Sequence, residues 1–292
     1  MSRTNRPDWL KVRFKAGYDF TGVENLLERL KLNTVCEEAA CPNKGECFNR
    51  KTATFMILGR VCTRSCTFCN VSGGKTETVN PFEPENIAQA VKELELKHVV
   101  ITSVTRDDLS DGGAGHFVEV INSIKSKYND VVIEVLIPDF NGNEDALNTV
   151  ISAGPDIINH NVETIPSLYD EVRPQADYHQ SLELLRRVKN KNKSIYTKSG
   201  IMLGLGETQK GVLAVFRDLR DAGCDFLTVG QYLSPSDKHH PVVDWVHPDI
   251  FDSYHKAAID AGFLHASCAP LVRSSYLADE AVKAVKSGKR KS

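Results

Sequence analysis

The chain of 292 residues contains no apolar run that approaches the roughly 18 residues needed to span a bilayer. Its first residues, MSRTNRPDWLKVRF, include no hydrophobic stretch of the kind found in a secretory signal. Its charges nearly cancel, with a formal net charge of −2, so the chain as a whole has little attraction for nucleic acid or for an anionic membrane. The absence of long apolar runs and the small net charge predict a cytoplasmic protein that binds neither nucleic acid nor membrane.

A disulfide framework is not expected either, although the sequence has eight cysteines. Secreted disulfide-rich domains are smaller than this chain and carry a signal peptide. Six of the cysteines fall between Cys36 and Cys69, and only Cys224 and Cys268 lie elsewhere. Cysteines clustered in this way in a large chain favour ligation of a metal ion or an iron–sulfur cluster.

Strand and helix patterns alternate from residue 55 onward. Short apolar runs rich in β-branched residues are typical of buried parallel strands, and they cover residues 55–59, 98–104, 131–138, 156–163, 198–206 and 225–233. Amphipathic helical patterns lie between them, at residues 84–96, 115–128 and 208–223. In VISAGPDII, LRDAGCDFL and AIDAGFLHA, a helix end continues through Ala-Gly into a strand. The repeated order of helix and strand indicates an α/β fold.

Six strands are too few for a closed barrel of eight. The count predicts a partial (β/α)6 barrel of the TIM type over residues 55–240, although the alternation alone also permits a doubly wound open sheet. Residues 1–54 lie outside the alternation and are expected to form an N-terminal extension that binds a cluster. Residues 241–292 are expected to form a C-terminal helical segment that completes the same site.

The segment VCTRSCTFCN raises the question of what binds three thiolates and leaves one position open. Cys62, Cys66 and Cys69 are spaced C-x3-C-x2-C, and no fourth cysteine follows closely. A structural zinc ion takes four protein ligands, whereas a 4Fe–4S cube held by three thiolates keeps one iron free for a small molecule. The triplet begins three residues after the first predicted strand, at the rim where barrel enzymes hold their active sites. The spacing favours an open cluster, with a zinc knuckle that takes a distant ligand as the alternative.

A second triplet precedes the first by fifteen residues. Cys36, Cys41 and Cys47 are spaced C-x4-C-x5-C and also lack a nearby fourth cysteine. On its own this spacing could bind zinc. Beside the first triplet it is interpreted as the site of a second iron–sulfur cluster.

The motifs together resemble known families. C-x3-C-x2-C with Phe68 before its last cysteine, followed by a (β/α)6 pattern, resembles the radical S-adenosylmethionine enzymes. The two triplets, with CPNKGEC, SVTRDDLSDGGAGHF, NHNVET, KSGIMLGLGET, GQYLSPS and VRSSY in this order, resemble the lipoyl synthase family over residues 30–280 or so. The resemblance implies an enzyme with two 4Fe–4S clusters that uses S-adenosylmethionine.

The activity that the resemblance implies is the insertion of two sulfur atoms at C6 and C8 of a protein-bound N6-octanoyl-lysine. Two S-adenosylmethionine molecules are consumed per product, and the second, auxiliary cluster is the sulfur donor. The implied partners are octanoylated lipoyl carrier domains, namely the acyltransferase subunits of 2-oxoacid dehydrogenases and the glycine cleavage H protein, with reduced ferredoxin or flavodoxin as electron donor. Two other hypotheses stay open: a sulfur-inserting radical enzyme resembling biotin synthase or a methylthiotransferase, and a non-enzymatic iron–sulfur or zinc protein.

The resemblance also implies a role for Ser275 in VRSSY as the fourth ligand of the auxiliary cluster. A serine alkoxide is harder than a thiolate and is easily protonated off iron, which suits a cluster that is dismantled during the reaction. From the sequence alone, Ser275 would instead be the N-cap of the helix that follows it. Arg273 is expected to lie close to the cluster and, as a hypothesis, to gate this serine.

Residues after the second predicted strand are candidates for binding S-adenosylmethionine. Gly112 and Gly113 allow the backbone to approach a ligand closely, and the resemblance places such a pair at the methionine end of the cofactor. A Gly-Gly pair before a helix is also an ordinary turn. Asp107, with its neighbours Arg106 and Asp108, either serves the same pocket or lies on a solvated loop.

Polar residues also mark two later strands. Asn161 and Glu163 share one strand face and are predicted to face cofactor or substrate, because a polar barrel interior is costly unless it binds something. His160, which directly precedes Asn161, is expected to be a satisfied core histidine. Lys198 and Glu207 form either a ligand clamp or a pair of ordinary surface charges.

Three further residues receive no catalytic role from the sequence. His239 matches a histidine of the lipoyl synthase family, but its part in the chemistry is not indicated. Cys224 and Cys268 fit no ligand pattern, and Cys268 is expected to be a packed free thiol.

Overall fold

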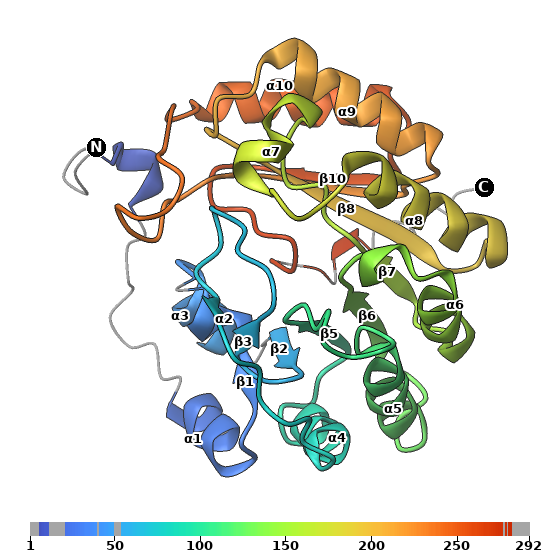
Figure 1. The fold of residues 1–292 in the computed structure, drawn as a ribbon. Helices are drawn as coiled ribbons and strands as arrows, with labels where there is room; N and C mark the ends of the chain where they lie inside the picture. The colour runs from blue at the N-terminus through green and yellow to red at the C-terminus, as the bar shows by residue number, and fades with distance from the viewer. Residues whose placement is uncertain are drawn as a thin grey trace. The chain divides into compact units, whose positions relative to one another are not determined.

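A computed structural model describes residues 6–11, 21–39, 41–49, 54–276, 278, 280 and 281 (Figure 1). The chain has an α/β fold, and its main sheet has the strand order β1-β2-β5-β6-β7-β8-β9-β10. This order does not close on itself within the described residues, and its strands are largely parallel, so the predicted α/β fold, a partial rather than a closed barrel, is confirmed. No helix in the described part of the chain is both long and apolar enough to cross a membrane.

The chain packs as two compact units. Of the described residues, those within 13–64 and 70–158 form one unit, and those within 1–12, 65–69 and 159–292 form the other. β7 (Ile157–Asn159) spans the boundary between them. The three segments predicted from the sequence, 1–54, 55–240 and 241–292, were defined by their roles rather than by packing, and they remain a prediction.

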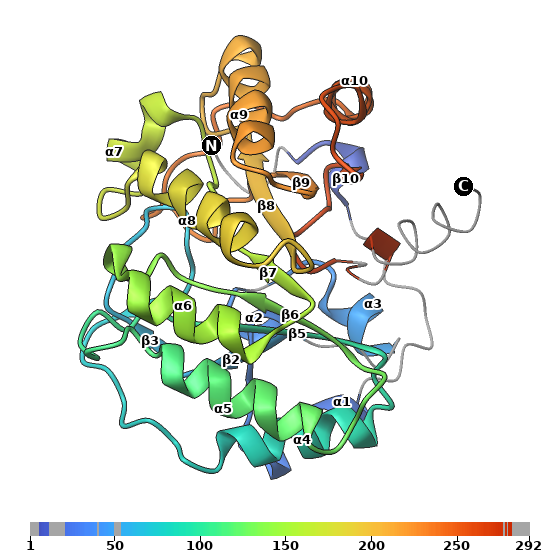
Figure 2. The same ribbon diagram turned by 90° about the vertical axis from the view of Figure 1, so that its right-hand side faces the viewer.

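The unit of residues 13–64 and 70–158 is built on four strands. β1 (Asn33–Thr34) runs antiparallel to β2 (Thr54–Ile57), which pairs in parallel with β5 (His98–Ser103), and β5 pairs in parallel with β6 (Val132–Leu136). The helices of this unit are α1 (Thr21–Arg29), α2 (Val35–Glu38), α3 (Lys44–Asn49), α4 (Glu83–Glu93), α5 (Ala114–Lys125) and α6 (Glu144–Ala153). Figure 2 shows α4, α5 and α6 in one row beside the strands. Shorter elements are β3 (Val61–Cys62), β4 (Ser72–Gly73) and the 3-10 turn η3 (Phe140–Gly142).

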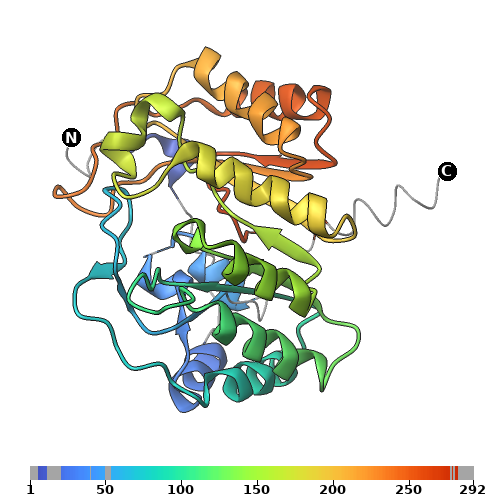
Figure 3. The same ribbon diagram turned by 45° about the vertical axis from the view of Figure 1, so that its right-hand side comes forward.

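The other unit is built on β8 (Tyr196–Leu203), β9 (Phe226–Gln231) and β10 (His265–Cys268), which pair in parallel. Its helices are α7 (Tyr169–Val172), α8 (Tyr178–Lys191), α9 (Gln209–Asp221) and α10 (Pro248–Asp260), with 3-10 turns η2 (Asp8–Leu10) and η4 (Pro166–Leu168). Figures 1 and 3 show α9 and α10 side by side above these strands. β10 adds a parallel strand to the six that were predicted, so the C-terminal segment is not only helical.

The predicted helices are confirmed within a few residues, because their apolar positions are buried against the strands. Ile87 and Val91 on α4 and Phe117 on α5 are at most 2% exposed. β10 escaped the apolar pattern because HASC is short and carries two polar side chains, although the Ala-Gly repeat before it pointed to a strand. β7 ends earlier than predicted, and Glu163 beyond it adopts a left-handed backbone with φ of 66°.

Candidate functional site

The last two cysteines of the C-x3-C-x2-C triplet bracket one turn. The backbone N–H of Cys69 donates to the carbonyl of Cys66 at 3.1 Å, and both side chains are half-buried. Between them, the backbone N–H of Thr67 donates to the carbonyl of Val172 at 3.1 Å, and its hydroxyl donates to the carbonyl of Glu171 at 2.9 Å. The end of α7 therefore holds this turn, although more than one hundred residues of chain separate the two.

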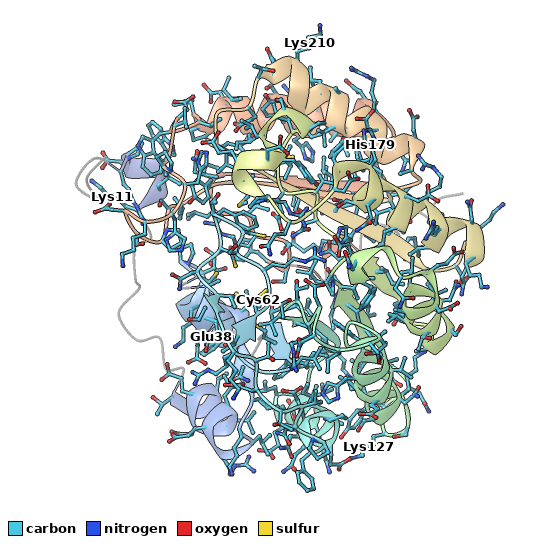
Figure 4. The ribbon with its side chains drawn as sticks, in the orientation of Figure 1. Lys11, Glu38, Cys62, Lys127, His179 and Lys210 are labelled. Carbon is cyan, nitrogen blue, oxygen red and sulfur yellow. The ribbon has the colours of Figure 1, made fainter. Side chains whose placement is uncertain are left out.

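The first cysteine of the triplet, Cys62, ends β3 in the other unit and is labelled in Figure 4. Its side chain is half-buried, and its Sγ accepts a hydrogen bond from the backbone N–H of Arg64 at 3.4 Å. Hydrogen bonds of this type tune the reduction potential of clusters bound through cysteine sulfur. Cys62 is therefore placed on a backbone that also supplies a donor to its sulfur.

Arg64, whose backbone meets Cys62, is itself fixed by two carboxylates. Its guanidinium pairs with Asp107 through Nε at 2.8 Å and with Asp139 through Nη1 at 2.8 Å and Nη2 at 2.7 Å. Asp139 is buried, and these two partners raise the pKa of Arg64 above its usual value against the opposing effect of burial. Asp107, predicted as a cofactor contact, thus forms an ion pair with Arg64. In this unit it helps to hold the backbone that follows Cys62.

Breaking this arrangement is expected to destabilise the fold. Asp139→Asn removes one charge from a buried pair, because the side chains of Arg64 and Asp139 are 7% and 1% exposed. We expect the free energy of unfolding to fall by about 3 kcal/mol in chemical denaturation, near the lower end for breaking a buried pair since Asp107 remains. Glu183→Gln, which alters an exposed ion pair on α8, should change it by less than about 1 kcal/mol. If both substitutions lower the free energy of unfolding by the same small amount, the pair of Arg64 and Asp139 does not stabilise the fold as described.

The cysteines of the second triplet lie on and between α2 and α3. Cys36 is buried, and the backbone N–H of Cys41 donates to its carbonyl at 3.2 Å. Burial raises the pKa of the Cys36 thiol to about 12, and the neighbouring Cys41 and Cys47 add to the effect. The three thiols are therefore close enough to interact electrostatically, and binding iron here would release protons.

Within the described residues, no three His, Cys, Asp or Glu side chains converge as they would around a single metal ion. The thiolates of a cubane each bind a different iron, so they stand farther apart than the ligands of one ion. Sulfur donors in sets of three have the ligand chemistry that iron–sulfur clusters require. The residues present thus fit the two clusters that the resemblance implies.

The VRSSY segment crosses β9 at a glycine. A Cβ atom added to Gly230 would lie 2.1 Å from the carbonyl oxygen of Val272, so only glycine permits this close approach of two backbones. Beyond it, the N–H of Tyr276 donates to the carbonyl of Arg273 at 3.0 Å, which makes a turn that contains Ser275. Ser275 and Arg273 are half-buried. The helix that Ser275 could cap extends into residues outside the described ones.

Asn161 and Glu163 come together, but not on one strand face as predicted, because β7 ends at Asn159. The amide Nδ2 of Asn161 donates to Oε1 of Glu163 at 3.0 Å, and burial raises the pKa of that carboxyl group. The charge of Arg173 on the following turn opposes this shift. Nη1 of Arg173 donates to the carbonyl of Asn161 at 2.9 Å and to the hydroxyl of Tyr169 at 3.1 Å. A buried cation, a carboxylate and an amide therefore share one place after β7.

Two polar atoms of this group have no protein partner. Oδ1 of Asn161 and Nε of Arg173 are buried and make no hydrogen bond, which is costly unless a ligand satisfies them. The Cβ of a residue replacing Gly200 would lie 2.9 Å from Oδ1 of Asn161, so glycine leaves room beside it. Cys66 contributes to the electrostatic surroundings of Arg173. An unfilled donor and acceptor beside a cluster cysteine fit a small zwitterion with hydroxyl groups, as S-adenosylmethionine is.

Glu163→Gln is therefore expected to weaken binding of S-adenosylmethionine. It removes the carboxylate that can accept from ligand hydroxyls, and hydrogen bonds to charged groups contribute about 1.5–3 kcal/mol, so Kd should rise about tenfold to one hundredfold. Equilibrium dialysis with the anaerobic, iron-loaded protein measures this change. The exposed carboxylate variant Glu183→Gln should leave Kd unchanged. An unaltered Kd in Glu163→Gln would remove Glu163 from the binding site.

The glycine pair after β5 has a clear packing role. Gly112 and Gly113 have φ of 61° and 89°, and Gly113 precedes the first residue of α5. A Cβ on Gly113 would lie 2.3 Å from a methyl group of Leu58. Nearby, Arg106 pairs with Asp108 at 2.8 Å and holds the pKa of that carboxyl group at about 2. This loop is braced rather than loosely solvated, and a contact of the glycines with S-adenosylmethionine stays a prediction.

The other residues singled out from the sequence, His160, Lys198 and Glu207, have different surroundings in the structure. His160 is 2% exposed and its Nε2 lies 3.1 Å from the hydroxyl of Ser181 on α8, so the satisfied core histidine is confirmed. Lys198 on β8 is buried and is not a surface charge. Glu207 accepts from the N–H groups of Gly204 and Leu205 at 2.7 and 2.9 Å, and so it closes its own loop.

Two functional candidates have no role that was predicted from the sequence. Arg173 follows a short helical turn in a segment without an apolar pattern, and only its burial and open Nε reveal it. His239, left without a role, places Nε2 3.1 Å from the carbonyl oxygen of Cys69. Neither residue could be assigned a role from the sequence, because the contacts that define each one form only when the chain folds.

Comparison with known proteins agrees with this geometry. Residues 56–219 match the family model described as the radical SAM superfamily. The chain is 58% identical over 283 residues to a lipoyl synthase of Alkaliphilus metalliredigens, covering 97% of this chain and 98% of that one. It is 56% identical over 285 residues to a lipoyl synthase of Caldicellulosiruptor saccharolyticus, covering 98% and 100%.

Solved structures of more distant proteins share the fold. Methylornithine synthase (PylB) aligns with a TM-score of 0.54 at 15% identity, covering 86% of this chain and 82% of that one. HydG, a maturase of the [FeFe]-hydrogenase, aligns with a TM-score of 0.57 at 15% identity, covering 85% and 62%. With the full-length identity to lipoyl synthases, the radical SAM match and the two cysteine triplets, the chain belongs to the lipoyl synthase family of the radical SAM superfamily.

Proposed function

We propose that the chain inserts two sulfur atoms at C6 and C8 of an octanoyl group that is amide-linked to a lysine of a lipoyl carrier domain. The observation that carries this proposal is identity of 54–58% with lipoyl synthases over nearly the whole chain. The presence of both cysteine triplets in that chain supports it, because radical cleavage needs one cluster and sulfur supply needs another.

The first site would be formed by Cys62, Cys66 and Cys69. When bound there, a 4Fe–4S cluster supplies the electron that cleaves S-adenosylmethionine to methionine and a carbon radical able to remove hydrogen from an alkyl chain. Asn161 and Glu163 would bind the polar groups of S-adenosylmethionine, since they are hydrogen-bonded to each other beside an open amide oxygen. Gly112, Gly113 and Lys198 remain proposed contacts.

Arg173 would add a fixed positive charge to the same place. Its Nη1 is occupied by the carbonyl of Asn161 and the hydroxyl of Tyr169, so its orientation is set before a ligand arrives. Its Nε remains open for an acceptor. The chain thus orients the reacting molecule with groups that are already held in position.

The second site would be formed by Cys36, Cys41, Cys47 and Ser275, with Arg273 beside the serine. Its cluster would be the source of the two inserted sulfur atoms and hence a substrate of the reaction. An alkoxide ligand is lost from iron on protonation more easily than a thiolate, which would ease opening of the cluster. Val272 lies against Gly230, so the turn that carries Ser275 is held close to β9.

The partners follow from this activity. Octanoylated lipoyl carrier domains, such as the acyltransferase subunits of 2-oxoacid dehydrogenases and the glycine cleavage H protein, would be the substrates. A reduced ferredoxin or flavodoxin would supply electrons. A location in the cytoplasm, without nucleic acid or membrane as a partner, is proposed from the sequence.

A single anaerobic turnover tests the proposal. Reconstituted protein is mixed with reductant, S-adenosylmethionine and an octanoyl-lysine peptide from a lipoyl domain, and the peptide mass is followed. After its two thiols are oxidised to the cyclic disulfide in air, the expected product has gained two sulfur atoms and lost two hydrogens, and an intermediate with one sulfur precedes it. Cleavage of S-adenosylmethionine while the peptide stays untouched would contradict the proposal and favour a different sulfur-inserting enzyme.

A further inference from the structure

The segment of residues 65–69 is held by two other segments of its own unit. On one side, the end of α7 accepts hydrogen bonds from Thr67. Beyond α7, Oε1 of Gln175 accepts from the N–H of Ser65 at 2.7 Å. On the other side lies the loop after β9, whose His239 and His240 both meet the segment. We call residues 236–240 the histidine loop.

The histidine loop meets the cysteine turn at two carbonyl groups. The backbone N–H of His240 donates to the carbonyl of Thr67 at 2.9 Å. The ring Nε2 of His239 lies 3.1 Å from the carbonyl oxygen of Cys69. A carbonyl can only accept, so Nε2 of His239 must carry the hydrogen and donate it.

The other ring nitrogen of His239 has a partner of its own. Its Nδ1 lies 2.8 Å from the hydroxyl of Ser236. With Nε2 protonated in a neutral ring, Nδ1 accepts and the hydroxyl of Ser236 donates. Ser236 therefore fixes the ring orientation in which His239 can reach Cys69.

The histidine loop is anchored to the sheet, so it can serve as a fixed support. The hydroxyl of Tyr232, directly after β9, donates to the carbonyl of His240 at 2.7 Å. Tyr232 is 2% exposed and packs with Val172 and Leu205, and Phe68 of the cysteine turn packs against the same cluster. One apolar cluster thus joins the turn, α7 and the loop.

We propose that His239 is a positioning residue for the first cluster: its Nε2–H holds the carbonyl of Cys69 and thereby sets the third thiol ligand. The inference rests on the proposed function, because it assumes that Cys69 binds iron. Partners that orient metal ligands typically change metal affinity or activity by about 10–100-fold when removed. His239 acts through its contact with Cys69 rather than by touching the reacting atoms.

The test uses variants of the full chain, and the two replacements of His239 nearly retain its side-chain volume. His239→Leu removes the donor, and His239→Gln keeps an N–H donor on a side chain of similar reach. His179→Ala is the matched control, since this exposed histidine of α8, labelled in Figure 4, contacts the ring of Tyr178. Each protein is reconstituted anaerobically, and iron, sulfide and the rate of cluster bleaching by a chelator are measured.

We expect His239→Leu to lose one cluster to the chelator about tenfold faster than the parent chain. His239→Gln should restore most of the resistance, and His179→Ala should match the parent. The KM for S-adenosylmethionine should rise in His239→Leu while the auxiliary cluster keeps its spectrum. A donor-dependent difference between leucine and glutamine separates positioning from a general packing defect.

Two outcomes are decisive in different ways. If the parent chain holds both clusters and His239→Leu resists the chelator equally well, the positioning role is wrong and the proposed function stands. If the parent chain takes up no iron, the proposed function fails first, and the inference about His239 fails with it.

Discussion

Replacing Cys62 with alanine is expected to reduce reductive cleavage of S-adenosylmethionine to background. The change leaves two cysteine ligands, Cys66 and Cys69, for a cluster that needs three. Without a cube that has one iron open, S-adenosylmethionine has no metal to bind and no source of the cleaving electron. Anaerobic incubation with reductant, followed by chromatography of methionine and 5′-deoxyadenosine, measures the loss.

The control for this experiment is a cysteine outside both triplets. Cys268 lies on β10, and burial raises the pKa of its thiol to about 12, so it is a protonated thiol at neutral pH. Cys268→Ala should retain cleavage and both clusters. Persistent cleavage in Cys62→Ala, or its loss in Cys268→Ala, would show that the triplet has been assigned wrongly.

Replacing Cys36 with alanine is expected to separate the two halves of the reaction. Cys36 belongs to α2, and the variant should lose the auxiliary cluster while the C-x3-C-x2-C triplet stays intact. Cleavage of S-adenosylmethionine should continue near the parent rate, but no sulfur should appear in the octanoyl peptide. Iron per chain should fall to about half that of the parent, as expected when one of two equal clusters is lost.

The interpretation of Cys36→Ala depends on keeping the fold intact. Cys36 is buried, so its replacement also removes apolar contacts. Cys224→Ala is the matched control, because Cys224 is fully buried in the other unit and has no assigned ligand role. Sulfur insertion that survives in Cys36→Ala would mean that the sulfur comes from elsewhere.

Much of the fold could be predicted because hydrophobic periodicity is local. Buried runs such as residues 98–104 and 131–138 became β5 and β6 with small shifts at their ends. The Ala-Gly repeat also marked the entry to β10, yet its polar sequence hid the strand. Strand ends depend on tertiary contacts, as the early turn at Glu163 shows.

The candidate site, like the fold, could be predicted where it depends on local sequence and not where it depends on contacts between distant residues. Cysteine spacing identified both triplets, since ligation depends on residue type and local reach. The support of Cys62 through Arg64 and Asp139 could not be predicted, because those residues are 75 positions apart. Arg173 and His239 could not be predicted either. Each is recognised by a contact with a backbone carbonyl, of Asn161 and of Cys69 respectively, and no sequence pattern encodes such a contact.

The central claim is that the first cluster keeps one iron free for S-adenosylmethionine. Mössbauer spectroscopy of the chain reconstituted with iron-57 tests this directly. Adding S-adenosylmethionine should shift the signal of one iron site in one cluster and leave the auxiliary cluster unchanged, with no shift in Cys62→Ala. A spectrum that S-adenosylmethionine does not alter, or a chain that binds no iron, would contradict the account.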